Sequence, residues 1–256
     1  MKRLILLLTL SIATILSSSK SVNAQEEVDF SERFFMSFNS STYTDFVKSP
    51  IRTVSAVVAN RPNPNDPFGP GIPVYAEVPY QSWGWSLFSL GLEPRFNVYE
   101  MNDEAALAIS IPFSFGMYQV VPASNEVGGN EAFGGIQIPI LAKLYLGSSS
   151  TYESEKDFGI SLGIGMEFNK LGLVNVNGGE GGEGNGGWMM PVSSLGIHFW
   201  RGSMPMEINL KFGFGPRTDY FVNKFGDPLK DSFGNLTSGS SRASSFKLTF
   251  GYLLNY

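Results

Sequence analysis

The feature of this sequence that most constrains its fold is an alternation of apolar and other residues with period two. Successive side chains of a β-strand point to opposite faces, so this period predicts strands that have one apolar face. In the last such segment the apolar or aromatic face carries Phe246, Leu248, Phe250, Tyr252, Leu254 and Tyr256. The other face carries Ser245, Lys247, Thr249, Gly251, Leu253 and Asn255. The segment is therefore expected to separate an apolar environment from a more polar one.

The same pattern predicts seven further strands upstream. Five long apolar stripes cover residues 88–98, 107–117, 136–146, 158–168 and 206–214. Two shorter stripes cover residues 34–38 and 195–199. Together with the last segment, they predict eight strands.

The connections between these strands alternate in length. Short ones lie around residues 101–103, 148–156 and 201–203, and long ones at 41–82, 119–133, 170–188 and 217–243. An even number of strands with this alternation is typical of an up-and-down barrel with short periplasmic turns and longer external loops. We therefore predict an all-β fold, an antiparallel up-and-down transmembrane β-barrel of eight strands. A weaker alternation at 53–59, with a mate near 74–80, leaves open a ten-stranded barrel or an external hairpin.

Alternation alone does not decide whether the apolar face points to lipid or into an interior, as in a soluble lipocalin-like barrel. Eight strands enclose a space that side chains just fill. The face opposite the apolar one is rich in glycine, for example at Gly163, Gly165 and Gly213. Such a face suits a crowded interior, whereas an exterior of Phe, Ile and Leu on nearly every strand would be insoluble in water. The apolar face is therefore expected to contact lipid.

Charged residues in the middle of the predicted strands all share the inner face. Facing lipid, such charges would cost several kcal/mol each near the midplane, so the lumen is the expected place for them. Three acids and four bases in a narrow space should pair and form a polar plug instead of an open pore. This predicted lumen charge network consists of Glu93, Arg95, Lys143, Glu167, Glu207, Lys211 and Lys247.

The four tryptophans lie at or just beyond the ends of predicted strands. They are Trp83, Trp85, Trp188 and Trp200. Aromatic side chains concentrate at both membrane interfaces of transmembrane barrels. The positions of the tryptophans therefore predict interfacial girdles.

The N-terminal segment has the composition of a secretory signal peptide. Lys2 and Arg3 precede an apolar run at residues 4–16 and a polar stretch that ends at Ala24. The run is shorter than the roughly 20 residues that a spanning helix needs. We therefore expect a signal peptide at residues 1–24, cleavage between Ala24 and Gln25, and one barrel domain at residues 25–256.

Cysteine and charge content narrow the function classes of the mature chain. The chain has no cysteine, which leaves no thiol for a disulfide or a lipid anchor. Removing Lys2, Arg3 and Lys20 with the signal peptide leaves 15 bases against 23 acids, a net charge of −8. This charge argues against a nucleic-acid partner.

With these features the mature chain resembles the small outer-membrane barrels of the OmpA and OmpX type and the porin-family barrels common in Bacteroidetes. The most specific element is the segment 246–256, which is similar to the assembly signal of that class, although Tyr256 stands where Phe is usual. The resemblance implies an outer-membrane location in a Gram-negative bacterium, contact with outer-membrane lipid, and recognition by the barrel insertion machinery. It implies little about function, since members of the class differ widely in function.

No group of residues points to catalysis, a cofactor or a metal. Small barrel enzymes such as lipid A deacylases place His with Ser or Asp at the outer rim. The one histidine here, His198, is three residues before the turn at Arg201, which puts it near the periplasmic end instead. We expect a lumen-facing histidine bonded to inner polar groups. The glycine-rich segment 178–187 lacks the lysine of a P-loop and the Asp-rich pattern of a calcium loop, so it is expected to be a flexible external loop.

The sequence therefore favours a non-enzymatic integral barrel whose external loops bind an outer-membrane protein or a surface ligand. The proline-rich segment 61–70 and the aromatic residue that follows at Tyr75 either dock on a partner or cap the barrel mouth. A narrow pore for ions or small solutes is the alternative. A lipid-modifying enzyme is the third possibility, disfavoured by the position of His198.

Overall fold

The computed structural model describes residues 30–122, 132–175, 186–220, 227–228, 230, 234 and 238–255. A one-turn helix, α2 (Phe30–Arg33), precedes the first strand. Within these residues no helix is long and apolar enough to cross a membrane.

Eleven strands make up nearly all of the remaining described chain. They are β1 (Phe34–Lys48), β2 (Arg52–Arg61), β3 (Ile72–Tyr80), β4 (Ser82–Asn102), β5 (Ala105–Ser110), β6 (Phe113–Pro122), β7 (Ala132–Gly147), β8 (Phe158–Asn175), β9 (Trp188–Arg201), β10 (Met204–Tyr220) and β11 (Ser238–Leu253).

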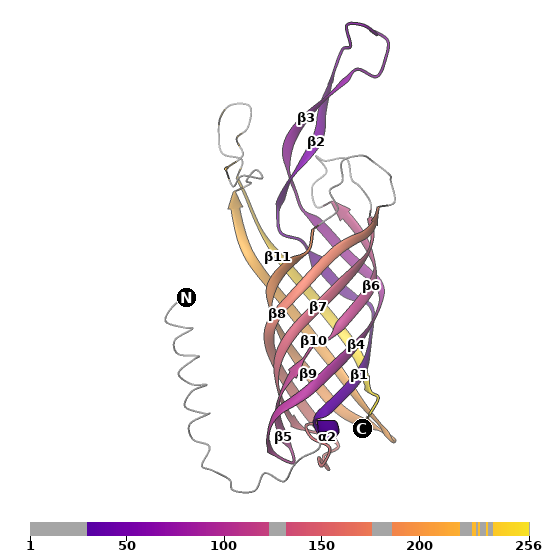
Figure 1. Ribbon diagram of the computed structural model, residues 1–256, viewed down its shortest axis with the longest axis vertical. Helices are drawn as coiled ribbons and strands as arrows, with labels where there is room; N and C mark the ends of the chain where they lie inside the picture. Colours follow the sequence, from indigo (N-terminus) through magenta and orange to yellow (C-terminus); the bar gives the residue numbers. More distant parts are fainter. Residues whose placement is uncertain are drawn as a thin grey trace. The chain divides into compact units, whose positions relative to one another are not determined.

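Antiparallel hydrogen bonding closes nine of these strands, all except β2 and β3, into a ring (Figure 1). The order is β1, β11, β10, β9, β8 and β7, then β5 with β6, then β4, which pairs with β1 again. β5 and β6 are two halves of one ring strand, because both pair with β4 on one side and with β7 on the other. The ring therefore has eight strands, and the predicted all-β antiparallel barrel is confirmed.

The break between β5 and β6 lies at two prolines that face each other across the wall. The β5–β7 ladder ends at the pair Ser110–Leu141, and the β6–β7 ladder begins at Ser114–Gln137. Pro112 and Pro139 fall in this interval, and proline has no N–H to donate. On the other side, Ile111 N still donates to Pro94 O at 3.0 Å. The wall is therefore held by β4 but interrupted towards β7.

β2 and β3 form a separate two-stranded antiparallel sheet, with Val54 opposite Val78. The weak alternation at 53–59 and 74–80 was therefore a true strand signal. The ten-stranded barrel is wrong, and the hairpin alternative is correct.

Connections at one end of the ring are short. Two-residue turns at residues 103–104 and 202–203 join β4 to β5 and β9 to β10, and Gly202 has a φ of +65° that suits glycine. The long connections at the opposite end start later than predicted, because β1, β8 and β10 continue to Lys48, Asn175 and Tyr220. Ladder hydrogen bonds continue a strand beyond its apolar stripe, so the stripe underestimates the strand.

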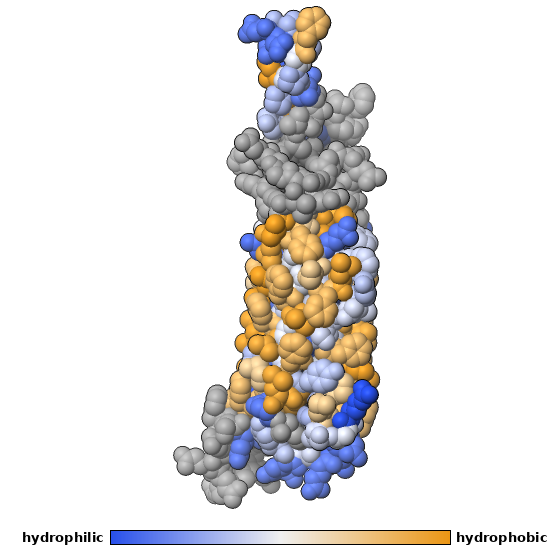
Figure 2. All heavy atoms as spheres, turned by 90° about the vertical axis from the view of Figure 1, so that its right-hand side faces the viewer, coloured by the Kyte–Doolittle hydropathy of each residue, from blue (hydrophilic) through white to orange (hydrophobic). Residues whose placement is uncertain are grey.

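The outer surface of the barrel is apolar, and the inner surface is polar. Each ring strand carries at least one large apolar side chain that is more than a third exposed, such as Ile140, Leu162, Ile164 and Phe250. Figure 2 shows hydrophobic residues covering most of the barrel wall on one side of the molecule. On β8 the exposed positions 158–168 alternate with buried or half-buried glycine, serine and glutamate. The predicted assignment of the two faces is confirmed.

The predicted tryptophan girdle is wrong at one position. Trp83 and Trp85 are exposed and Trp200 is half-buried, but Trp188 is buried inside the barrel. β9 begins with three large residues, so side-chain size does not show which of them face the lumen. In the structure Met189 points outward, whereas Trp188 and Met190 point inward.

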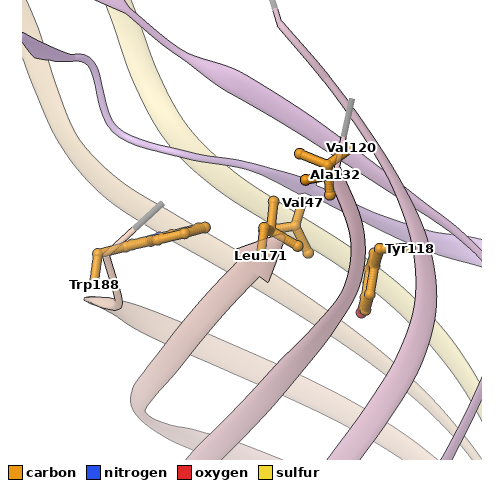
Figure 3. Packing of buried hydrophobic residues seen from close by; sticks show 6 residues of the cluster. All are labelled: Val47, Tyr118, Val120, Ala132, Leu171 and Trp188. Atoms are coloured by element: carbon orange, nitrogen blue, oxygen red, sulfur yellow. The ribbon is translucent and has the colours of Figure 1, made fainter. Parts of the chain in front are cut away.

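Trp188 belongs to an apolar cluster at the long-loop end of the lumen. The cluster comprises Val47, Tyr118, Val120, Ala132, Leu171 and Trp188. Figure 3 shows these side chains converging from β1, β6, β7, β8 and β9. Apolar packing therefore fills this end of the barrel.

Candidate functional site

Among the described residues, eight charged side chains lie in the lumen, and seven of them are those of the predicted network. All are at most 7 % exposed, and they are Asp45, Glu93, Arg95, Lys143, Glu167, Glu207, Lys211 and Lys247. Asp45 was missed because residues 41–82 were assigned to a loop. Phe46, which is in phase with the stripe at 34–38, is the signal that would have extended β1 to include it. With Asp45, the buried charges described in the lumen are four acids and four bases.

Lys143 is the centre of the first ion cluster. Its Nζ lies 2.7 Å from Glu93 Oε1 and 3.4 Å from Glu207 Oε1. Asn39 Nδ2 donates to Glu93 Oε2 at 2.8 Å, and Asn209 Nδ2 donates to Glu207 Oε1 at 2.9 Å. Charge pairing with added hydrogen bonds is what makes buried ions tolerable in a low-dielectric interior.

A second ion cluster lies nearer the apolar cluster. Lys211 pairs with Glu167, and Lys247 Nζ lies 2.9 Å from Asp45 Oδ2. Gln137 joins the two pairs, because its Oε1 accepts from Lys211 at 2.9 Å and its Nε2 donates to Asp45 at 3.2 Å. The hydroxyl of Tyr118 also donates to Asp45, which ties this ion cluster to the apolar cluster.

Arg95 has no acidic partner within ion-pair distance in the described part of the chain, which differs from the predicted pairing of all the lumen charges. Its guanidinium lies 3.8 Å from the ring centre of Phe35 and 4.1 Å from that of Tyr145. Its Nη2 donates to Ser149 O at 2.8 Å. A planar guanidinium stacks on aromatic rings in a way that lysine does not, which accounts for the difference.

The connection from β7 to β8 closes the short-turn mouth of the barrel. Ser149, Ser150 and Thr151 are at most 3 % exposed. Asn97 Nδ2 donates to Ser150 O at 2.8 Å, and the ring of Tyr152 stacks on Phe35 at 4.7 Å between centroids. The connection 148–157, predicted as a short turn over residues 148–156, therefore forms a plug in the mouth through its buried residues 148–151.

A small cavity remains between the two ion clusters. Its volume is about 40 Å³, and its polar lining includes Asn39, Glu93, Ser114, Asn209, Lys211 and Lys247. Pro112 and Pro139 also line it, at the interrupted part of the wall. A water needs roughly 10–15 Å³ of such volume, so the cavity has room for a few waters.

His198 is buried inside the barrel, as expected from its place on the strand. Its Nε2 lies 3.7 Å from Glu207 Oε1, and its ring meets Tyr145 edge-on at 5.2 Å between centroids. Neither ring nitrogen has a hydrogen-bond partner among the described residues, so the expected bonds to inner polar groups are not present.

Ser161 is a neighbour of this histidine that sequence spacing could not reveal. A Cβ added to Gly196 would lie 2.8 Å from Glu207 Oε1 and 3.3 Å from His198 Nε2, and it would also touch Ser161 Oγ. Ser161 Oγ has no hydrogen-bond partner among the described residues, and the side chain is fully enclosed. Ser161 and His198 are therefore not hydrogen-bonded to each other as a nucleophile and its base would be. The same part of the chain holds no group of three His, Cys, Asp or Glu side chains placed for a metal ion.

The predicted assembly signal lies on the outward face of β11 as far as it is described. Phe246 and Leu248 are half-buried, whereas Phe250, Tyr252 and Leu254 are exposed. Tyr256 lies outside the described residues, as do Ala24 and Gln25 at the predicted cleavage site. Of the glycine-rich segment only residues 186 and 187 are described.

Comparisons with known proteins give no sequence relative. No protein-family model matches the chain, and no curated protein sequence matches it. Among solved structures, the chain is similar to the outer membrane protein OprG from Pseudomonas aeruginosa, with a TM-score of 0.38 and 9 % identity. That match covers 88 % of this chain and 99 % of the other.

Proposed function

We propose that this chain is an integral outer-membrane β-barrel of a Gram-negative bacterium that is not an enzyme. In this proposal the barrel is a closed scaffold whose external loops bind an outer-membrane protein or a surface ligand. The observation that carries the proposal is the combination of an apolar exterior on every ring strand with charges that are buried and paired inside.

The exterior supports a membrane location. A transmembrane β-strand needs about 9–11 residues. On β8 the outward positions from Phe158 to Phe168 are all apolar, and Lys170 is the next outward residue. An apolar surface of this extent exposed to water would cause aggregation.

The side chains that fill the lumen support the proposal that the barrel is a scaffold and not a channel. The plug at residues 148–157, the two ion clusters and the apolar cluster occupy successive levels of the barrel. A permeating solute would have to separate buried ion pairs, which costs several kcal/mol for each unpaired charge. We therefore assign binding of the partner or surface ligand to the long loops, which lie at the end of the barrel opposite the short turns.

A narrow pore is the second candidate, and the cavity beside Lys211 and Lys247 is the observation that favours it. Conductance across planar bilayers distinguishes the two candidates. The reconstituted full-length mature chain should give no steady current. A steady, ion-selective current would contradict the scaffold and support the pore.

Binding through the loops has its own test. Cells would produce either the parent or a variant in which the β2–β3 hairpin, residues 52–80, is replaced by a short Gly-Ser linker. Proteins retained on each after gentle solubilisation of the outer membrane would then be compared. We expect a partner that is lost with the hairpin while the barrel stays heat-modifiable. Identical sets of retained proteins would exclude the hairpin as the binding element.

A further inference from the structure

Three bases form an outward-facing basic patch at the long-loop end of the barrel. Arg217 on β10 lies directly opposite Arg242 on β11, and both are exposed. Lys48 on β1 lies opposite Ser244, which is two residues from Arg242 on the same face of β11. Lys48, Arg217 and Arg242 therefore occupy neighbouring positions on three adjacent strands.

Aromatic side chains lie beside this basic patch on the membrane-facing surface. Phe46, Phe246 and Phe212 lie opposite one another on β1, β11 and β10, with ring centroids 6.5 Å and 5.4 Å apart. Lys48 Nζ lies 5.6 Å from the ring centre of Trp83. The wall thus presents an apolar aromatic row with cations at its outer edge.

The outward-facing wall at the long-loop end carries bases. No outward-facing ring position there whose side chain is described is acidic, and Lys170 on β8 adds a further base. The exposed acids described at this end, Asp66 and Asp227, lie in the connections beyond the ring strands. The wall at this end therefore complements an anionic membrane surface.

We infer that the basic patch binds the phosphate groups of a phosphorylated glycolipid of the external leaflet, of the lipid A type. This inference rests on the proposed outer-membrane location. Guanidinium groups match phosphate oxygens in bidentate hydrogen bonds, and two of them side by side can hold one phosphate. The acyl chains of the same lipid would lie along the row formed by Phe46, Phe246 and Phe212.

The test is a titration of the detergent-solubilised mature chain with diphosphoryl lipid A and with dephosphorylated lipid A, followed by tryptophan fluorescence. We expect the parent to bind the diphosphoryl form at least tenfold more tightly. Arg217→Gln/Arg242→Gln should lose at least that factor towards the diphosphoryl form and bind the dephosphorylated form unchanged. The control Lys156→Gln/Arg201→Gln removes the same charge at the opposite end and should behave as the parent.

Several results would overturn the inference. One is equal affinity of the parent and Arg217→Gln/Arg242→Gln for diphosphoryl lipid A, and another is equal affinity of the parent for both lipids. Competition by inorganic phosphate at the concentration of the lipid would assign the basic patch to free phosphate. Binding of phosphatidylglycerol as tight as that of diphosphoryl lipid A would exclude a glycolipid site. Failure of the proposed location is seen separately, as absence of the chain from fractionated outer membranes.

Discussion

Replacing Lys143 with methionine should strongly destabilise the barrel, because it leaves two buried carboxylates without their cation. Lys143 is fully buried and lies 2.7 Å from Glu93 and 3.4 Å from Glu207. Methionine fills a similar volume, so the change removes charge more than packing. Removing one partner of a buried ion pair costs about 3–5 kcal/mol, and we expect the free energy of unfolding to fall by this amount.

Urea unfolding of the chain folded into lipid vesicles measures this change. The matched control is Lys156→Met, because Lys156 pairs with Glu104 at 3.2 Å while both side chains are about half exposed. An exposed pair contributes about 0–1 kcal/mol, so this control should be nearly as stable as the parent. The triple variant Lys143→Met/Glu93→Gln/Glu207→Gln removes the unpaired charges and should recover most of the loss.

Two results would refute this reasoning. Equal losses for Lys143→Met and Lys156→Met would mean that water reaches the lumen cluster and screens its charges. A triple variant less stable than Lys143→Met would mean that the carboxylates gain more from Asn39, Ser110 and Asn209 than they lose by repulsion.

Three further predictions concern the whole barrel. The chain should migrate at different apparent sizes in detergent gels before and after boiling, since a closed ring pairs its internal backbone groups; equal mobility would count against closure. Protease added to intact cells should cut first within residues 178–187, whereas cleavage only at 148–156 would mean an inverted topology. Tyr256→Ala should lower the amount of protein in the outer membrane without changing heat modification of the inserted molecules, because one interfacial aromatic contributes only about 1.5–3 kcal/mol to stability. Tyr256→Phe should be harmless, and unchanged surface abundance of Tyr256→Ala would contradict the role of the terminal aromatic in assembly.

Sequence periodicity was sufficient to predict the strands of the ring and which face of each strand is apolar. An apolar stripe with period two is a local property of the sequence. It identifies both the strand and the face of that strand that is expected to contact lipid. The inner positions of Lys143, Glu167 and Lys211 follow from the same count along their strands. Local pattern failed where it was interrupted, as at the polar run before Asp45, or where both faces are apolar, as at Trp188.

The contacts among the side chains in the lumen were decided only by the tertiary structure. Which strands bring side chains to the same level is set by the stagger of all eight ladders together, and no single segment contains that information. Periodicity therefore predicted that the inner charges share one space. Only the assembled ring decided that Lys143 joins Glu93 to Glu207, that Arg95 stacks on Phe35 and Tyr145, and that residues 148–157 close the mouth. These contacts join residues far apart in the chain, and their partners are fixed by register and barrel closure.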